Sequence, residues 1–146
     1  MKKIVSFYMK GTRFNTAIDN AGLLHTGDRQ TALTWMDAVV NFKPVTSRHG
    51  YPVEINALWY NALCRLAAHY TEQGNAEAEY FQSLAEQVKK SFNALFWNEQ
   101  TGCLNDCVFP DGRADASIRP NQIFAVSLPY SCLLYTSDAA DEEDSV

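Results

Sequence analysis

The sequence predicts an all-α fold, and two adjacent helical segments are the observations that predict it. Residues 53–73 repeat apolar side chains at i, i+3, i+4 and i+7, and their other faces are only mildly polar. Residues 76–97 carry an apolar stripe opposite a charged face. Because only Gly74 and Asn75 separate them, the two helices must form an antiparallel hairpin. The first helix is expected to be buried nearly all round and the second to be half exposed. This difference favours an inner ring of helices covered by an outer ring, as in an α/α toroid.

The other segments are shorter and less regular. Residues 2–9 are ambiguous between helix and strand, and residues 20–28 and 42–50 are predicted to be loops around the apolar segment 32–40. The N-terminal third is therefore loop-rich. Residues 103–110 are predicted to be extended. A third helix is predicted from Pro120 to residue 128, because proline favours the first position of a helix and a second proline follows at 129.

The charge distribution argues against a nucleic-acid partner. Five of the 17 acidic residues lie at positions 138–144, which leaves 12 acids against 12 bases in residues 1–131. A balanced body lacks the basic face that phosphates require, so we expect a neutral substrate. No apolar run is long enough to cross a bilayer or to serve as a signal peptide, and the four cysteines form no CxxC pair. We expect a cytoplasmic protein without membrane contact. Since no phosphate loop and no helical histidine pair is present, we also expect no cofactor and no metal.

Several polar and aromatic residues are candidates for a site. Asp37 follows Trp35 within an apolar and aromatic segment, where desolvation would favour its protonated form and allow it to act as a general acid near neutral pH. Local capping or ion pairing is the simpler interpretation. Glu54 opens the buried helix, where the helix dipole favours a negative charge whether or not the residue serves a site. The polar residues that could bond a polyhydroxylated ligand are Arg48, His49, Asp106, Asp115, Arg119, Asn121 and Gln122.

The last fifteen residues look foreign to the rest of the chain. Residues 132–141 (CLLYTSDAAD) resemble the translation of a transposase adapter used in preparing sequencing libraries. A natural acidic tail would explain the charges but not this ten-residue match. We therefore divide the chain into an authentic part, 1–131, and an adapter-derived tail, 132–146, and expect the authentic part to be a fragment.

Four segments together resemble the C-terminal glucosidase domain of glycogen debranching enzymes. They are residues 33–38 (LTWMDA), 44–48 (PVTSR), 52–63 (PVEINALWYNAL) and 117–125 (SIRPNQIFA). The resemblance extends from about residue 14 to 130. Residues 96–106 also look like the hairpin link of six-hairpin glycosidases.

This resemblance implies an (α/α)6 barrel and a specific reaction. The reaction is inverting hydrolysis of the α-1,6-linked glucosyl stub at a branch point of glycogen or a limit dextrin. The resemblance places the general acid on Asp37, and the implied substrate-binding residues are Trp35, Arg48, Glu54, Asn121 and Gln122. Inversion also needs a second carboxylate to activate water. We expect that base beyond residue 131, so the fragment alone should be inactive.

Two other functions fit the same residues. One is a different toroid glycosidase, glucoamylase-like or trehalase-like, which would differ in the linkage it cleaves. The other is a non-catalytic helical module that binds carbohydrate, with the hairpin at 53–97 as one unit of a solenoid. No second copy of that unit occurs at a fixed period.

Overall fold

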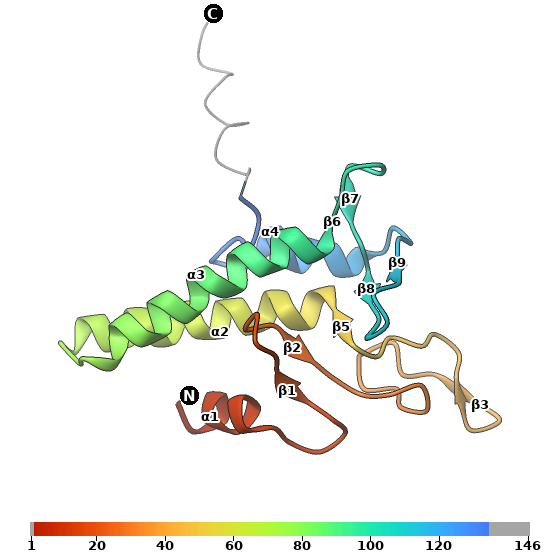
Figure 1. Cartoon of the computed structure of the whole chain (residues 1–146), viewed down its shortest axis with the longest axis horizontal. Coiled ribbons are helices and arrows are strands. Elements are labelled where there is room, and N and C mark those ends of the chain that lie inside the picture. The colour runs from red at the N-terminus through yellow and green to blue at the C-terminus, as the bar shows by residue number, and fades with distance from the viewer. Residues whose placement is uncertain (1, 135–146) are drawn as a thin grey trace, which may run out of the picture.

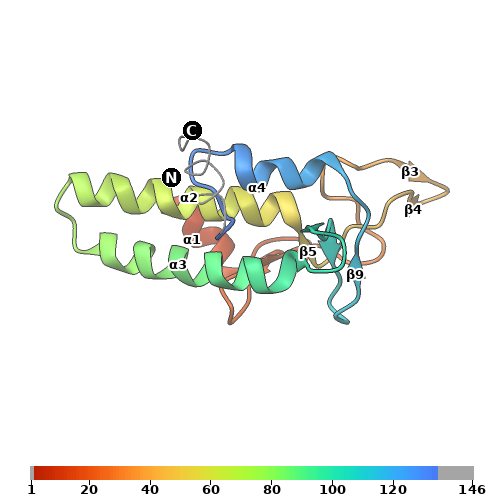
Figure 2. The same cartoon turned by 90° about the horizontal axis from the view of Figure 1, so that it is seen from above.

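The computed structural model describes residues 2–134, and a pair of antiparallel helices runs through it (Figure 1). Helix α2 spans Val53–Glu72 and helix α3 spans Glu77–Phe96, which confirms the predicted hairpin. Helix α4 (Phe124–Ser127) packs on α2 on the side away from α3, as Figure 2 shows. Helix α1 (Lys2–Lys10) also contacts α2, which resolves the ambiguity at the N-terminus in favour of a helix.

The central position of α2 explains its sequence. Eleven of its side chains are buried, among them polar Glu54, Asn56 and Asn61, because helices cover it on several sides. Helix α3 buries a single stripe and leaves its charged face in water. The stripe consists of Phe81, Ala85, Val88, Phe92 and Phe96. The predicted difference between a nearly enclosed helix and a half-exposed one is therefore confirmed.

The predicted all-α class is wrong, and so is the fragment of an (α/α)6 toroid drawn from it. The structure is 43% helical and 17% strand, with the strands in several small sheets. The strands within residues 2–134 are Ala17–Ile18 (β1), Leu24–His25 (β2), Val39–Val40 (β3), Lys43–Pro44 (β4), Tyr51–Pro52 (β5), Trp97–Asn98 (β6), Cys103–Leu104 (β7), Cys107–Val108 (β8) and Ala114–Asp115 (β9). Each strand has two residues, which is too short for a period-two pattern to be visible in the sequence.

A three-stranded antiparallel sheet lies at the N-terminal end of α2. Its order is β5-β8-β9, with Tyr51 opposite Val108 and Cys107 opposite Asp115. Gly50 precedes β5 with a φ of +95°, and a Cβ there would lie 2.6 Å from the carbonyl oxygen of Val108. Glycine is therefore required for the close approach of these two segments. The sheet brings the loop before β5, the first turn of α2 and the loop before β8 together.

The hairpin β3-β4 projects from the body of the molecule (Figure 1). Its turn residues Asn41 and Phe42 have φ values of +50° and +62°, the left-handed conformation of a two-residue turn. The Phe42 side chain is 97% exposed. Asp37 lies immediately before this hairpin.

A helix begins where the third helix was predicted, but its first turn is a 3₁₀ helix and not an α-helix. Residues Pro120–Ile123 form a 3₁₀ helix, η1, and α4 follows directly. Proline occupies the start of η1 as expected.

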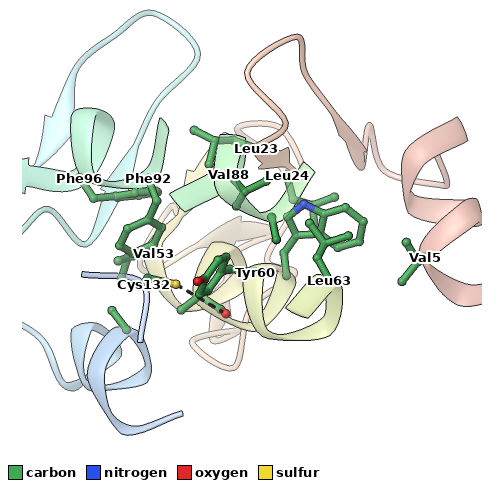
Figure 3. Close-up of a cluster of buried hydrophobic side chains, with 14 of the residues drawn as sticks. Val5, Leu23, Leu24, Val53, Tyr60, Leu63, Val88, Phe92, Phe96 and Cys132 are labelled. Carbon is green, nitrogen blue, oxygen red and sulfur yellow. Dashed lines mark hydrogen bonds between the residues drawn. The ribbon is translucent and has the colours of Figure 1, made fainter. Parts of the chain in front are cut away.

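The hydrophobic core joins α1, the β2 segment, α2, α3 and the C-terminal segment (Figure 3). Val5 of α1 packs at one side, and Val53, Phe92 and Phe96 belong to the central helices. Cys132, the first residue of the predicted foreign tail, is fully buried, and its Sγ lies 3.9 Å from the carbonyl oxygen of Ala57. Residues 135–146 of that tail lie outside the described residues.

Candidate active site

A buried arginine connects two buried carboxylates at the start of α2. Arg48 lies in the loop before β5 and donates to both carboxylate oxygens of Glu54, at 2.5 and 2.6 Å. Its Nε donates to Asp106 Oδ2 at 2.7 Å, and its Nη2 donates to the Asp106 carbonyl at 3.0 Å. Arg48 is 4% exposed, and Glu54 and Asp106 are each 2% exposed. The guanidinium fork therefore ties the first turn of α2 to the loop before β8.

Asp106 is the centre of a wider network. Beyond Arg48, its carboxylate accepts from Arg119 Nη1 at 2.6 Å and from Asn121 Nδ2 at 2.5 Å. Arg119 also bonds Asp115 of β9 at 2.7 Å. The amide oxygen of Asn121 accepts from the indole Nε1 of Trp35 at 2.8 Å. We call the set Trp35, Arg48, Glu54, Asp106, Asp115, Arg119 and Asn121 the Asp106 network.

Opposite charges compensate one another inside this network. Burial alone would lower the pKa of Arg48, but the hydrogen bonds and charges of Glu54 and Asp106 outweigh it and raise that pKa above its ordinary value. The hydrogen bond to Asp115 is the largest cause of the raised pKa of Arg119. Burial acts to raise the pKa of Asp115, yet hydrogen bonds from Ser117 and Arg119 lower it overall. Both arginines are therefore held as cations among the carboxylates.

The structure brings four of the predicted site residues into one network. Trp35, Arg48, Glu54 and Asn121 are connected through Asp106, although 86 positions separate Trp35 from Asn121. The fifth predicted binding residue stands apart from these bonds. The side-chain oxygen of Gln122 accepts instead from the backbone N–H of Leu104 at 3.3 Å.

Asp37 does not have the buried environment expected from its sequence neighbours. It is exposed, and the adjacent Trp35 is 63% exposed. Within residues 2–134, its neighbours therefore do not bury the carboxyl. Its catalytic role stays a prediction.

A groove with a mainly apolar lining lies elsewhere. It measures about 530 Å³ and is lined by Ile4, Phe7 and Tyr8 of α1, by Leu24, and by Leu33 of the LTWMDA segment. Neither Trp35 nor Asp37 lines it. This groove therefore does not surround Asp37.

The network can orient side chains but has few groups free to bind. Among residues 2–134, no buried side-chain nitrogen or oxygen lacks a hydrogen-bond partner. Both oxygens of Glu54 are used by Arg48. Within the same residues no group of three His, Cys, Asp or Glu side chains is arranged to hold a metal. Trp35 and Asp37, by contrast, are exposed.

Asp106, Arg119 and Asp115 are the residues whose importance the sequence did not reveal. Each was one polar loop residue among several. The available signals were the position of Arg119 within the SIRPNQIFA segment and that of Asp106 at the end of the 96–106 link.

The fold occurs in a glycoside hydrolase. The chain is similar to the crystal structure of the GH78-family rhamnosidase of Bacillus sp. GL1, with a TM-score of 0.60 and 24% sequence identity. The match covers 85% of this chain and 12% of the rhamnosidase chain. Residues 1–141 match the amylo-alpha-1,6-glucosidase family, and the chain belongs to that family. This confirms the family resemblance noted in the sequence and places the chain in a glycosidase-type family. No curated protein matches the chain.

No helix within residues 2–134 combines the length and the apolar character needed to cross a bilayer.

Proposed function

We propose that this chain is part of the catalytic domain of an inverting glycosidase that removes α-1,6-linked glucosyl stubs from branched α-glucans. The observation that carries the proposal is the family match over residues 1–141. Trp35 and Asp37, two positions apart and both exposed, supply side chains suited to it. An aromatic face packs well against a sugar ring, and a nearby carboxyl can protonate a glycosidic oxygen.

In this mechanism Asp37 is the general acid. It donates a proton to the oxygen that links the glucosyl stub to the main chain, while water attacks the anomeric carbon from the opposite face. A second carboxylate, roughly 6.5 to 9.5 Å from the acid, removes a proton from that water. Because Asp37 is exposed here, the rest of the catalytic domain or the bound glucan must exclude water from it.

We place the general base outside residues 1–131. Glu54 and Asp106 are the buried carboxylates nearest in sequence to the proposed binding residues. Glu54 has both oxygens bonded to Arg48, and Asp106 accepts from Arg48, Arg119 and Asn121. A base must face the attacking water, and both carboxylates are 2% exposed and paired with arginine, so neither residue suits the role. The 146-residue chain alone should therefore release no glucose from a limit dextrin.

The decisive experiment uses the complete enzyme that contains this chain and the variant Asp37→Asn. Loss of a general acid should reduce kcat on a branched limit dextrin by about 10² to 10⁴. Hydrolysis of α-glucosyl fluoride should be much less affected, because fluoride leaves without protonation. Proton NMR of the first glucose released by the wild type should show the β anomer, as inversion requires.

Glu99→Gln serves as the matched control, since it makes the same change at an exposed turn residue and should leave turnover near normal. Near-normal turnover of Asp37→Asn on the dextrin would remove Asp37 as the proton donor. Comparison of α-1,6, α-1,4 and α,α-1,1 glucosides with an α-L-rhamnoside tests the linkage and the sugar. Preference for any but the first would overturn the proposed substrate.

We also propose that residues 132–146 derive from a sequencing adapter. Because the family match extends to residue 141, it does not separate an adapter from native sequence, and the source gene has to be sequenced. Amplification of the locus from source DNA should give codons that diverge after position 131. Continuation of the same codons in the native gene would contradict the proposal.

A further inference from the structure

One amide side chain fixes the segment that carries the proposed acid. Asn121 accepts from the indole N–H of Trp35 at 2.8 Å, and its Nδ2 lies 3.6 Å from Met36 Sδ. Thr34, at the start of the same segment, is buried, and its Oγ1 accepts from the Met36 backbone N–H at 3.3 Å. Asp37 is the next residue. The position of the carboxyl therefore depends on contacts that meet at Asn121.

The chemistry of its two partners dictates the orientation of this amide. An indole N–H can only donate, and an ionised carboxylate can only accept. Asn121 must therefore turn its oxygen to Trp35 and its nitrogen to Asp106, as observed. Neither an aspartate nor a leucine at position 121 makes both bonds.

Asp106 is itself held rigidly. Arg48 and Arg119 approach its carboxylate from two other segments, at 2.7 and 2.6 Å, and the side chain is 2% exposed. A buried carboxylate with three cationic or amide donors has little freedom to rotate. The chain of bonds thus leads from the first turn of α2 to the edge of the Trp35 ring.

Burial changes sharply along this chain of bonds. Asn121 is 1% exposed, whereas Trp35 is 63% exposed although its polar edge is anchored. An aromatic ring held by its edge keeps its faces open and loses little conformational entropy when a ligand stacks on it. This is the arrangement expected of a preorganised platform rather than of a ring that only fills the core.

We infer that Asp106 and Asn121 are positioning residues, which hold the Trp35 ring and the Asp37 segment in the orientation needed to bind and protonate a glucan. The inference rests on the proposed function for the identity of the ligand. The anchoring itself is a property of this chain and is measurable without any sugar.

The first experiment follows the indole N–H resonances of the 15N-labelled 146-residue chain. Its three tryptophans give three signals, and Trp35→Phe assigns one of them by its loss. In Asn121→Leu the indole loses its acceptor, and in Asn121→Asp the new carboxylate is repelled by Asp106 and turns away from its place beside Trp35. In both variants the Trp35 signal should shift and its N–H should exchange with water about tenfold faster, the effect of one lost hydrogen bond. The signal of Trp59, whose N–H bonds the Gly22 carbonyl, should stay native and reports that the variant is folded.

The double variant Asp106→Asn with Asn121→Asp exchanges the two groups. The carboxylate at position 121 can then accept from the indole and from the new amide, and the total charge of the Asp106 network is unchanged. The double variant should restore slow exchange of the Trp35 indole N–H with water. If Asn121→Asp merely damaged the local structure, the second change would not restore it. Gln122→Met is the matched control from the same 3₁₀ helix and should leave the Trp35 signal unchanged, because Gln122 bonds Leu104 instead.

The second experiment measures the complete enzyme. Asn121→Leu should lower kcat on a branched limit dextrin by about tenfold or more and affect α-glucosyl fluoride less, since only the first substrate needs an aligned proton donor. An unchanged Trp35 signal in a folded Asn121→Asp, or no recovery in the folded exchange pair, would refute the anchoring. Loosened Trp35 with unchanged kcat would refute the positioning role. If wild-type enzyme cleaves no glucan while Trp35 behaves as expected, the proposed function fails and the anchoring stands.

Discussion

Replacement of Arg48 by methionine tests how the Asp106 network contributes to stability. Methionine is close to arginine in length and packs without charge, so the variant removes the guanidinium with little loss of volume. Glu54 would lose the donors to both of its oxygens, and Asp106 would lose its bond to Nε while retaining those from Arg119 and Asn121. The two carboxylates are each 2% exposed, so water cannot replace the lost donors without local unfolding.

The expected cost is a large part of the total stability. Removal of one partner of a buried ion pair costs about 3 to 5 kcal/mol, compared with about 5 to 15 kcal/mol for the unfolding of an ordinary domain. With a urea m-value of about 2 kcal/mol/M, the unfolding midpoint should fall by roughly 2 M. Arg48→Lys keeps the charge but cannot span two carboxylates with a fork, so we expect an intermediate loss of about 2 kcal/mol.

Urea unfolding of the 146-residue chain followed by circular dichroism provides the measurement. Arg113→Met is the matched control, because Arg113 pairs with Asp111 at 2.9 Å while the two side chains are 67% and 45% exposed. That change should cost less than about 0.5 kcal/mol. A second change, Glu54→Gln, should recover part of the loss in Arg48→Met, because a neutral amide is less costly to bury unpaired. Equal stability of the two arginine variants, or no recovery in the double variant, would refute the reasoning.

Two further changes test other parts of the fold. Gly50→Ala should lower the free energy of unfolding by about 2 kcal/mol or more, because at a φ of +95° the new Cβ would lie 2.6 Å from the Val108 carbonyl oxygen. Gly102→Ala is the control and should cost only about 1 kcal/mol, because no atom lies within 4 Å of its Cβ position. Comparable melting temperatures for the two variants would contradict this prediction. Burial raises the pKa of the Cys107 thiol to about 12 from an ordinary 9.0, so above pH 9 the unfolded state loses a proton that the folded state keeps. The contribution of this thiol to stability is complete below pH 9 and declines by about 1.4 kcal/mol per pH unit between pH 9 and 12. In a series of urea melts at increasing pH, Cys107→Ala should flatten this alkaline decline, whereas Cys103→Ala should not.

The long helices were predictable because their signal is long. Twenty residues in each of α2 and α3 repeat the 3.6-residue pattern several times, and Gly74 marks the turn between them. The two-residue strands gave no comparable signal, since pairs such as Tyr51–Pro52 and Cys107–Val108 are joined by contacts across more than fifty positions. An all-α prediction follows naturally from a sequence in which only the helices are periodic.

The sequence selected residues that lie together, while their role in binding stays a prediction. Trp35, Arg48, Glu54 and Asn121 were selected through their motifs, and they do meet. The burial expected of Asp37 was wrong for a specific reason. Its apolar sequence neighbours, including Trp35, are themselves largely exposed, so they cannot withdraw it from water. Asp106 was not singled out because its partners come from segments that no local pattern connects.

The residues of the Asp106 network lie far apart in the sequence, and this separation sets the order in which their contacts can form during synthesis. The α2–α3 pair is made of contacts between neighbouring segments and can form soon after residue 96 is translated. Trp35 has to wait for Asn121, which the ribosome adds 86 residues later. Until residue 106 has been added, Arg48 has Glu54 but not Asp106 as a partner, and until residue 121 has been added, Trp35 lacks its bond to Asn121. The loop that carries Trp35 and Asp37 therefore gains this anchor only after residue 121 has left the ribosome, later than the contacts within the α2–α3 pair become available.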